Sequence, residues 1–182
     1  MPRNLLITAP PGTGKSTLVR RILQETSGER RGFYTEELRS NSERVGFRVV
    51  PDFCSRTLEG AVIAHTKYGG PKIGKYGIDI PRFEAVIPSL SGFNRDHYRP
   101  FLYLDEIGAI QLKSKVLFPF LVDLYLEAPN PFVGTIPVPE VYEDDCLKSI
   151  KARLDVEVRT ISRETWVRDL AYVRNFLSAG VN

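Results

Sequence analysis

The run LLITAPPGTGKSTLVRRIL, residues 5–23, decides the fold, and its centre is APPGTGKS at residues 9–16. This centre fits the phosphate-binding pattern G-x-x-x-x-G-K-[ST] except at its first position, where Ala9 replaces glycine. The short apolar run Asn4–Thr8 before it is typical of a buried parallel strand. After it, apolar side chains recur at helical spacing from residue 15 to about residue 26. A strand, a loop and a helix therefore follow one another in the order that a phosphate loop needs.

Each residue type in this loop has a chemical reason. Glycine at positions 12 and 14 lets backbone N–H groups curl around phosphate oxygens without a Cβ in the way. The Lys15 ammonium can reach the outer phosphates, and the Ser16 hydroxyl can bind Mg2+. The helix that follows directs its positive N-terminal end at the anion. We therefore predict nucleotide contacts from Ala9, Pro10, Pro11, Gly12, Thr13, Gly14, Lys15, Ser16 and Thr17, with Lys15 also in a catalytic role.

Alanine at position 9 is compatible with this prediction if the end of the strand keeps ordinary β dihedral angles there. If a positive φ were required, alanine would cost on the order of 1–2 kcal/mol. The phosphate contacts of such a loop are worth several times more. The predicted nucleotide site therefore does not depend on glycine at position 9.

A phosphate loop also needs a second strand that ends in an acid near the magnesium ion. The run FLYLDEIG, residues 101–108, reads as a buried strand that ends at Asp105 and Glu106. We predict that Asp105 and Ser16 hold Mg2+, directly or through water. Glu106 lies one residue further toward the γ-phosphate and is predicted to orient or deprotonate the attacking water. The alternative for Glu106 is a surface carboxylate or a hydrogen bond that orders the loop.

Strand-like and helix-like runs alternate along the rest of the chain. The β-prone runs GFYTEELR (32–39) and RVGFRVV (44–50) flank four polar residues and predict a hairpin directly after the first helix. Further strands are predicted at 58–66, 100–106, 131–139 and 156–161, helices at 81–93, 114–127, 140–153 and 163–178, and a mobile loop at 67–77. This alternation predicts one domain, residues 1–182, with a three-layer α/β fold, a mainly parallel sheet and a β-hairpin insertion after the first helix.

Composition sets limits on partners and location. The 182 residues are 42% hydrophobic and 26% charged, as in a globular domain, and the formal charge of +3 is too small to indicate nucleic-acid binding. No apolar run approaches the roughly 18 residues that span a bilayer, and the first residues do not read as a signal peptide. The two cysteines lack C-x-x-C spacing. We expect a soluble, cytoplasmic protein without a membrane or nucleic-acid partner; its oligomeric state is left open.

Four further stretches resemble one family, the THEP-type nucleoside triphosphatases. They are RGFYTEELR followed by RVGFRVV, then IGKYGIDI, LDEIG and GTIPV, in the family's order and at similar spacing between about Leu5 and about Ile161. The resemblance implies a single-domain P-loop NTPase fold. It also implies slow, magnesium-dependent hydrolysis of ATP, GTP and other nucleoside triphosphates, with little base preference.

The same resemblance implies roles for particular residues. It places Tyr34, Glu36 and Glu37 on the strand beside the phosphate loop. It implies that the loop after the acidic strand is close to the nucleotide, with contacts from Leu104, Asp105, Glu106, Ile107 and Gly108.

The chain departs from the family pattern at three places. The first is Ala9. The second follows DEIG, where the family commonly has Lys-Met-Glu and this chain has Ala-Ile-Gln at 109–111. The third follows the last strand, where the family often has Asn-Arg and this chain has ISRETW at 161–166, so that Arg163 or Trp166 is a candidate for contact with the base.

Basic side chains gather around the middle of the chain. One of Arg56, Lys67, Lys72 and Lys75 could neutralise charge in the transition state, as an arginine finger does. Lys75 is the best candidate because it lies in the family-like GKYG. The alternative is a solvated basic loop.

Two other functions use the same phosphate loop. A nucleoside or nucleotide kinase would pass the phosphate to a small acceptor, although the 34–50 hairpin is more strand-like than a kinase acceptor domain. A nucleotide switch would bind RNA or a protein partner and use hydrolysis as a timer, but no aromatic-basic RNA signature is present. The preferred base and the physiological substrate cannot be predicted from these patterns.

Overall fold

The computed structural model describes residues 2–25, 30–53, 56–57, 59–90 and 101–180. Its strands are β1 Asn4–Thr8, β2 Arg30–Ser40, β3 Glu43–Phe53, β4 Arg56–Thr57, β5 Ala61–His65, β6 Lys72–Ile73, β7 Tyr76–Ile78, β8 Phe101–Asp105, β9 Phe132–Ile136 and β10 Val156–Thr160. Its helices are α1 Lys15–Glu25, α2 Ile80–Glu84, η1 Ile87–Leu90, η2 Gln111–Lys113, α3 Leu117–Phe120, η3 Leu121–Leu126, α4 Asp145–Lys151 and α5 Trp166–Gly180.

These strands form one sheet in the order β10-β1-β9-β8-β2-β3-β5-β7-β6, with β4 paired to β3. The five strands β10, β1, β9, β8 and β2 pair with one another in parallel. Strands β1, β8 and β9 are buried along their whole length. Because parallel strands point the same way, the carboxyl ends of these three strands meet at one edge of the sheet, where ligands bind in open α/β sheets.

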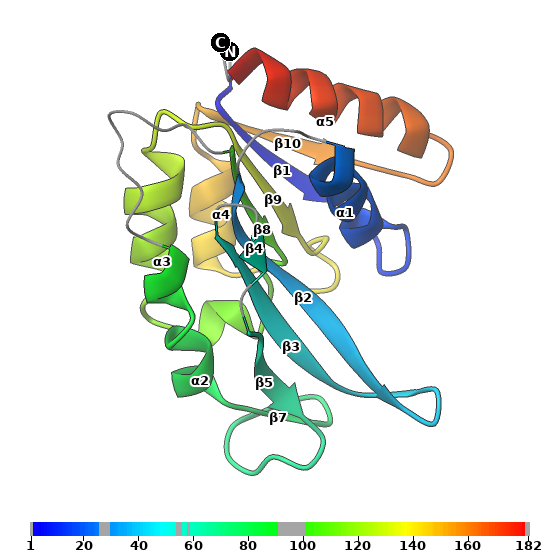
Figure 1. The fold of residues 1–182 in the computed structure, drawn as a ribbon, viewed down its shortest axis with the longest axis vertical. Coiled ribbons are helices and arrows are strands. Elements are labelled where there is room, and N and C mark those ends of the chain that lie inside the picture. Colours follow the sequence, from blue (N-terminus) through cyan, green and yellow to red (C-terminus); the bar gives the residue numbers. More distant parts are fainter. Residues whose placement is uncertain (1, 26–29, 54–55, 58, 91–100, 181–182) are drawn as a thin grey trace.

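Helices cover both faces of the parallel half, which makes three layers (Figure 1). Side chains alternate along β1: Leu5 and Ile7 pack with the apolar faces of α1 and α5, whereas Leu6 packs with the helices of the opposite face. The predicted three-layer α/β fold with a mainly parallel core and a hairpin insertion is therefore confirmed. No helix in the described ranges is long and apolar enough to cross a membrane.

The other half of the sheet is an antiparallel arm that extends from the parallel core (Figure 1). Strands β2 and β3 form the predicted hairpin, and its turn has positive φ at Asn41 (48°) and Ser42 (68°), polar residues that favour turns. Strands β5, β7 and β6 widen the arm by antiparallel pairing.

The predicted mobile loop at 67–77 is wrong, because it contains β6 and β7 joined by a tight turn. Gly74 has φ 56°, and a Cβ at Gly77 would lie 2.2 Å from the Tyr68 carbonyl oxygen. Gly74 therefore serves the turn through its positive φ, and Gly77 allows the close approach of the Tyr68 backbone. These two strands could not be predicted from the sequence because they are only two and three residues long.

Three predicted helices differ in extent. The apolar helix at 114–127 begins only at Leu117, because the Ser114 hydroxyl accepts the N–H groups of Val116 and Leu117, and it becomes a π-helical turn from Leu121. The polar helix at 140–153 begins at Asp145, where the Asp144 side chain caps it. The segment at 81–93, which we expect from its sequence to be a short helix ended or kinked at Pro88, instead ends its α-helix α2 at Glu84, and Pro88 lies within η1. Residues 91–93 lie outside the described residues.

Candidate active site

The phosphate loop lies between the end of β1 and the start of α1, as predicted. Gly12 and Gly14 have φ of +76° and +105°, a region that L side chains rarely adopt, so both positions need glycine. Within the loop the Thr13 N–H donates to the Pro10 carbonyl, and the Gly14 carbonyl accepts the Leu18 N–H as α1 begins. The loop therefore has the left-handed turns that direct backbone N–H groups toward an anion.

Ala9 and Lys15 close the loop from its two ends. The Lys15 Nζ donates to the Ala9 carbonyl oxygen at 2.7 Å. The Ala9 side chain is fully buried in the core. Asn41 and Ser42 are the described non-glycine residues with positive φ, so Ala9 keeps an ordinary backbone conformation.

We therefore expect Ala9→Gly to change nucleotide affinity by less than about 1 kcal/mol, because no strain at position 9 is relieved. Calorimetric titration with ATP measures this directly. Gly12→Ala is the matched variant, and we expect it to weaken binding because alanine resists a φ of +76°. A gain of about tenfold or more in affinity for Ala9→Gly would show that alanine strains the loop.

Asp105, at the carboxyl end of β8, is the buried acid of the site. Its Oδ1 accepts hydrogen bonds from the Ser16 hydroxyl at 3.1 Å and from the Thr135 hydroxyl at 2.6 Å. Its Oδ2 is buried and has no hydrogen-bond partner in the described structure. Burial raises the pKa of Asp105, although the bonds from Thr135 and Ser16 oppose this. A buried carboxylate oxygen without a partner, beside a serine hydroxyl, fits the oxygen ligands that Mg2+ prefers.

Thr135, at the end of β9, was missed by the motif search. Its backbone carbonyl also accepts the Ile107 N–H at 2.8 Å, so this one residue holds both the acid and the loop after it. The sequence could have indicated Thr135, because it is a polar residue near the end of a predicted buried strand. It also lies in GTIPV, one of the runs that resemble the family.

Glu106 follows Asp105 and is partly buried. Burial raises the pKa of Glu106; the Lys15 charge opposes this, and the Asp105 charge adds to it. Glu106 and Lys15 both line a cleft of about 580 Å3. The structure thus brings together the two predicted catalytic side chains and Ser16 in one cleft, with Asp105 hydrogen-bonded to Ser16.

The cleft lies between the phosphate loop, the β2–β3 hairpin and the segment after β9. Its lining residues are Ala9, Pro11, Gly12, Gly14, Lys15, Ser16, Thr17, Thr35, Glu37, Arg44, Phe47, Glu106, Pro137, Val138 and Val141. Gly108 lines an adjoining cleft of about 380 Å3 that also includes Glu106. The side chains of Leu104 and Ile107 are fully buried in the core, so nucleotide contact at these two positions, still a prediction, would have to come from the backbone.

The acids on β2 are already paired. Glu36 accepts from Arg48 at 2.6 Å, and Glu37 accepts from Arg39 at 2.6 Å and from Arg44 at 2.9 Å. Burial would raise the pKa of Glu37, but the hydrogen bonds and charges of the two arginines outweigh it and lower that pKa. Tyr34, on the same strand, pairs with Asp105 of β8 in the sheet.

Two residues after β10 lie against the phosphate loop. The Trp166 indole N–H donates to the Gly14 carbonyl at 3.3 Å, and the Arg163 guanidinium is 3.5 Å from the Gly12 carbonyl. A Cβ at Gly14 would lie 3.2 Å from the indole nitrogen. Both candidates for base contact are therefore beside the loop.

Trp166 is also the only tryptophan of the chain, so its fluorescence reports on the loop. We expect a saturable change in tryptophan emission on titration with ATP and Mg2+, because phosphate binding changes the surroundings of the Gly14 carbonyl. The Lys15→Ala variant keeps Trp166 and should give no change at the same concentrations. Unchanged emission while calorimetry records binding would contradict a coupling between Trp166 and the loop.

The fold and the site together define a P-loop nucleotide-binding protein: a left-handed glycine loop with Lys15 and Ser16 at the start of a helix, beside a buried Asp105. Residues 4–174 match the family described as NTPase. The chain belongs to this family.

Individual relatives agree with this assignment. The chain is 33% identical to the cancer-related nucleoside-triphosphatase homolog of Mus musculus, over 90% of each chain. It is 31% identical to the nucleoside-triphosphatase THEP1 of Thermotoga petrophila, over 94% of this chain and 93% of the relative. The solution structure of a human cancer-related nucleoside triphosphatase superimposes with a TM-score of 0.78 at 27% identity, over 97% and 98% of the two chains. The crystal structure of THEP1 from Aquifex aeolicus has the same fold, with a TM-score of 0.81 at 24% identity over 96% and 98%.

Proposed function

We propose that the protein hydrolyses nucleoside 5′-triphosphates, ATP and GTP among them, to the diphosphate and phosphate, slowly and with Mg2+. The observation that carries the proposal is that Lys15, Glu106 and Ser16 line one cleft, and that Ser16 donates a hydrogen bond to the buried Asp105. Relatives named nucleoside-triphosphatases across most of the chain support the class of enzyme.

The phosphate loop would bind the triphosphate through its backbone N–H groups and the Lys15 ammonium. Ser16 and Asp105 would hold Mg2+, which would supply positive charge at the β- and γ-phosphate oxygens. Thr135 keeps the Asp105 carboxylate in place by a 2.6 Å hydrogen bond. These residues position the γ-phosphate without forming a covalent bond to it.

Glu106 would orient a water molecule for attack on the γ-phosphorus and accept one of its protons. As the new P–O bond forms, the bond to the bridging oxygen breaks and its electron pair stays on the diphosphate. Position and charge would then provide most of the rate enhancement, as is usual for phosphoryl transfer.

Broad base specificity is part of the proposal. Base edges are commonly read by paired hydrogen bonds from Asn or Gln side chains. Neither residue type occurs among the described side chains that line the 580 Å3 cleft. A site that holds mainly the phosphates would accept several bases.

The test is release of inorganic phosphate from ATP, GTP, CTP and UTP, each with Mg2+ and with EDTA. We expect release from all four, within about tenfold of one another, and its loss in EDTA. Release that persists in EDTA, or that is confined to one base, would contradict the corresponding part of the proposal.

One observation favours a kinase as the second candidate. A cleft of about 500 Å3 adjoins the phosphate loop at Ser16 and Thr17, and two arginines, Arg20 and Arg48, line it. Arginines beside the transferred phosphate are what a phosphorylated acceptor would need. However, Arg48 is already paired with Glu36 in this cleft. We therefore rank water above an organic acceptor.

A further inference from the structure

Phosphoryl transfer builds negative charge around the γ-phosphate, and a cation on each side of that group stabilises the transition state best. Lys15 supplies one cation from the phosphate loop. Across the cleft, the β2–β3 hairpin supplies another, Arg44. These two are the basic side chains in the described lining of the 580 Å3 cleft.

Arg44 is held in place by three aromatic or acidic neighbours on the arm. Its Nη1 donates to Glu37 at 2.9 Å, and its Nε donates to the Tyr76 hydroxyl at 3.0 Å. The guanidinium carbon lies 5.2 Å from the centre of the Phe47 ring. The Tyr76 hydroxyl is also 3.4 Å from the Arg44 carbonyl, so β7 fixes the backbone and the side chain together. Such contacts reduce the entropy lost when the side chain binds an anion.

The same guanidinium keeps hydrogen-bonding capacity. The side-chain hydrogen bonds described for Arg44 use Nε and Nη1, which leaves Nη2 without a described partner. The side chain is 46% exposed. Arg44 can therefore donate to a phosphate oxygen without giving up its anchors, and the bidentate geometry of guanidinium suits that role.

Arg44 also lines the same two clefts as Glu106, the residue proposed to orient the water. These are the 580 Å3 cleft and the adjoining 380 Å3 cleft, so the two residues share the boundary between them. Arg44 and Lys15 line the 580 Å3 cleft from different elements, the β2–β3 hairpin and the phosphate loop.

We propose that Arg44 is a catalytic residue that supplies, within the same chain, the cation stabilising the transferring γ-phosphoryl group. The inference rests on the proposed hydrolysis. Arg44 donates hydrogen bonds to the γ-phosphate oxygens as the bond to the bridging oxygen breaks. It transfers no proton and remains a guanidinium throughout.

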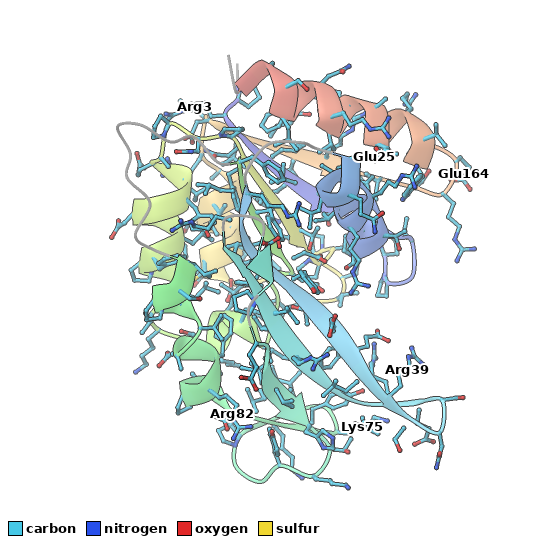
Figure 2. The ribbon with its side chains drawn as sticks, viewed as in Figure 1. Arg3, Glu25, Arg39, Lys75, Arg82 and Glu164 are labelled. Carbon is cyan, nitrogen blue, oxygen red and sulfur yellow. The ribbon has the colours of Figure 1, made fainter. Side chains whose placement is uncertain are left out.

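Of the basic residues expected in this role from sequence, the three lysines do not line either cleft in the described structure. Lys75 lies on the arm (Figure 2), where its Nζ is 5.7 Å from the Tyr76 ring centre. Lys67 and Lys72 are exposed, and the side chain of Arg56 lies outside the described residues. The sequence pattern of the hairpin predicts its strands but does not show which side chains enter the cleft. It therefore did not indicate Arg44.

Arg39 offers a matched control. It donates to the same carboxylate, Glu37, at 2.6 Å and is 57% exposed, but it does not line the cleft. Figure 2 shows it toward the outer end of the β2–β3 hairpin. Arg39→Ala therefore removes one of the two ion-pair partners of Glu37 without removing the cation at the cleft.

The test measures phosphate release and ADP binding for wild type, Arg44→Ala, Arg44→Lys and Arg39→Ala. We expect Arg44→Ala to lower kcat by about 10²-fold or more while ADP affinity stays within about threefold, because the charge acts mainly in the transition state. Arg44→Lys should recover part of the rate, and Arg39→Ala should stay within about threefold of wild type. Aluminium fluoride should tighten ADP binding to wild type and not to Arg44→Ala, because it mimics the planar phosphoryl group.

Two results would overturn the inference and leave the proposed hydrolysis standing. One is a kcat for Arg44→Ala within about threefold of wild type. The other is an equal loss in Arg44→Ala and Arg39→Ala, which would mean that both act only by holding Glu37. If the wild type released no phosphate from any nucleotide, the proposed function and this inference would both be wrong.

Discussion

Replacing Lys15 with alanine is expected to abolish nucleotide turnover while the protein stays folded. The Lys15 ammonium makes its described hydrogen bond to the Ala9 carbonyl at 2.7 Å and takes part in no described ion pair, so the core does not depend on it. The apolar face of α1 that packs in the core is formed by Leu18, Val19, Ile22 and Leu23. Loss of one charged donor at a transferring phosphate typically lowers the rate by about 10²–10³-fold or more.

Phosphate release at saturating ATP, together with thermal unfolding, tests this expectation. Lys148→Ala, at an exposed lysine of α4, is the matched substitution away from the cleft and should leave turnover unchanged. A folded Lys15→Ala variant that releases phosphate at the wild-type rate would contradict the assignment of the phosphate loop.

The second large effect is expected at Glu106. Glu106→Gln should keep the nucleotide and Mg2+ bound, because Lys15, Ser16 and Asp105 are unchanged, yet lose about 10²–10⁴-fold in kcat as the group that orients the water is lost. Asp105→Asn should instead weaken binding and magnesium dependence together, because it changes the carboxylate that accepts from Ser16 and Thr135. The pair of variants separates a water-orienting group from a metal ligand.

If Glu106→Gln hydrolyses ATP at a rate within a few-fold of wild type, a group other than Glu106 must orient the attacking water. The next candidates are Glu37 on β2, which lines the same cleft, and Glu36 on the same strand, which lines the adjacent 500 Å3 cleft. Each is already an ion-pair acceptor, Glu36 with Arg48 and Glu37 with Arg39 and Arg44. The hydrogen bonds and charges of the two arginines lower the pKa of Glu37, whereas burial raises the pKa of Glu106, so Glu106 is the stronger base of these two.

The parallel core and the phosphate loop could be predicted because their signals are local. The strand Asn4–Thr8, the glycines at positive φ and the start of α1 all lie within one short run of sequence. The position of Asp105 beside Ser16 followed from a general rule, that parallel strands end at the same edge. Neither inference needed knowledge of distant contacts.

The missed parts depend on pairs of residues far apart in sequence. Thr135 contacts Asp105 from the neighbouring strand. Trp166 was a candidate for contact with the base, but its hydrogen bond to Gly14, from the start of the last helix, was not predicted. Arg44 enters the cleft because Tyr76, on another strand of the arm, fixes its side chain. Hydrophobic periodicity carries no information about such partners, and short strands such as β6 fall below the length at which it can be read.

The most direct test of the account is the fate of the γ-phosphate. Labelled ATP with Mg2+ should yield one inorganic phosphate for each diphosphate formed, at the same rate with or without added nucleosides and nucleoside monophosphates. Glu106→Gln should reduce this release without reducing binding. Transfer of the label to an added acceptor, with little free phosphate in its absence, would contradict hydrolysis and identify the 500 Å3 cleft of Arg20 and Arg48 as an acceptor site.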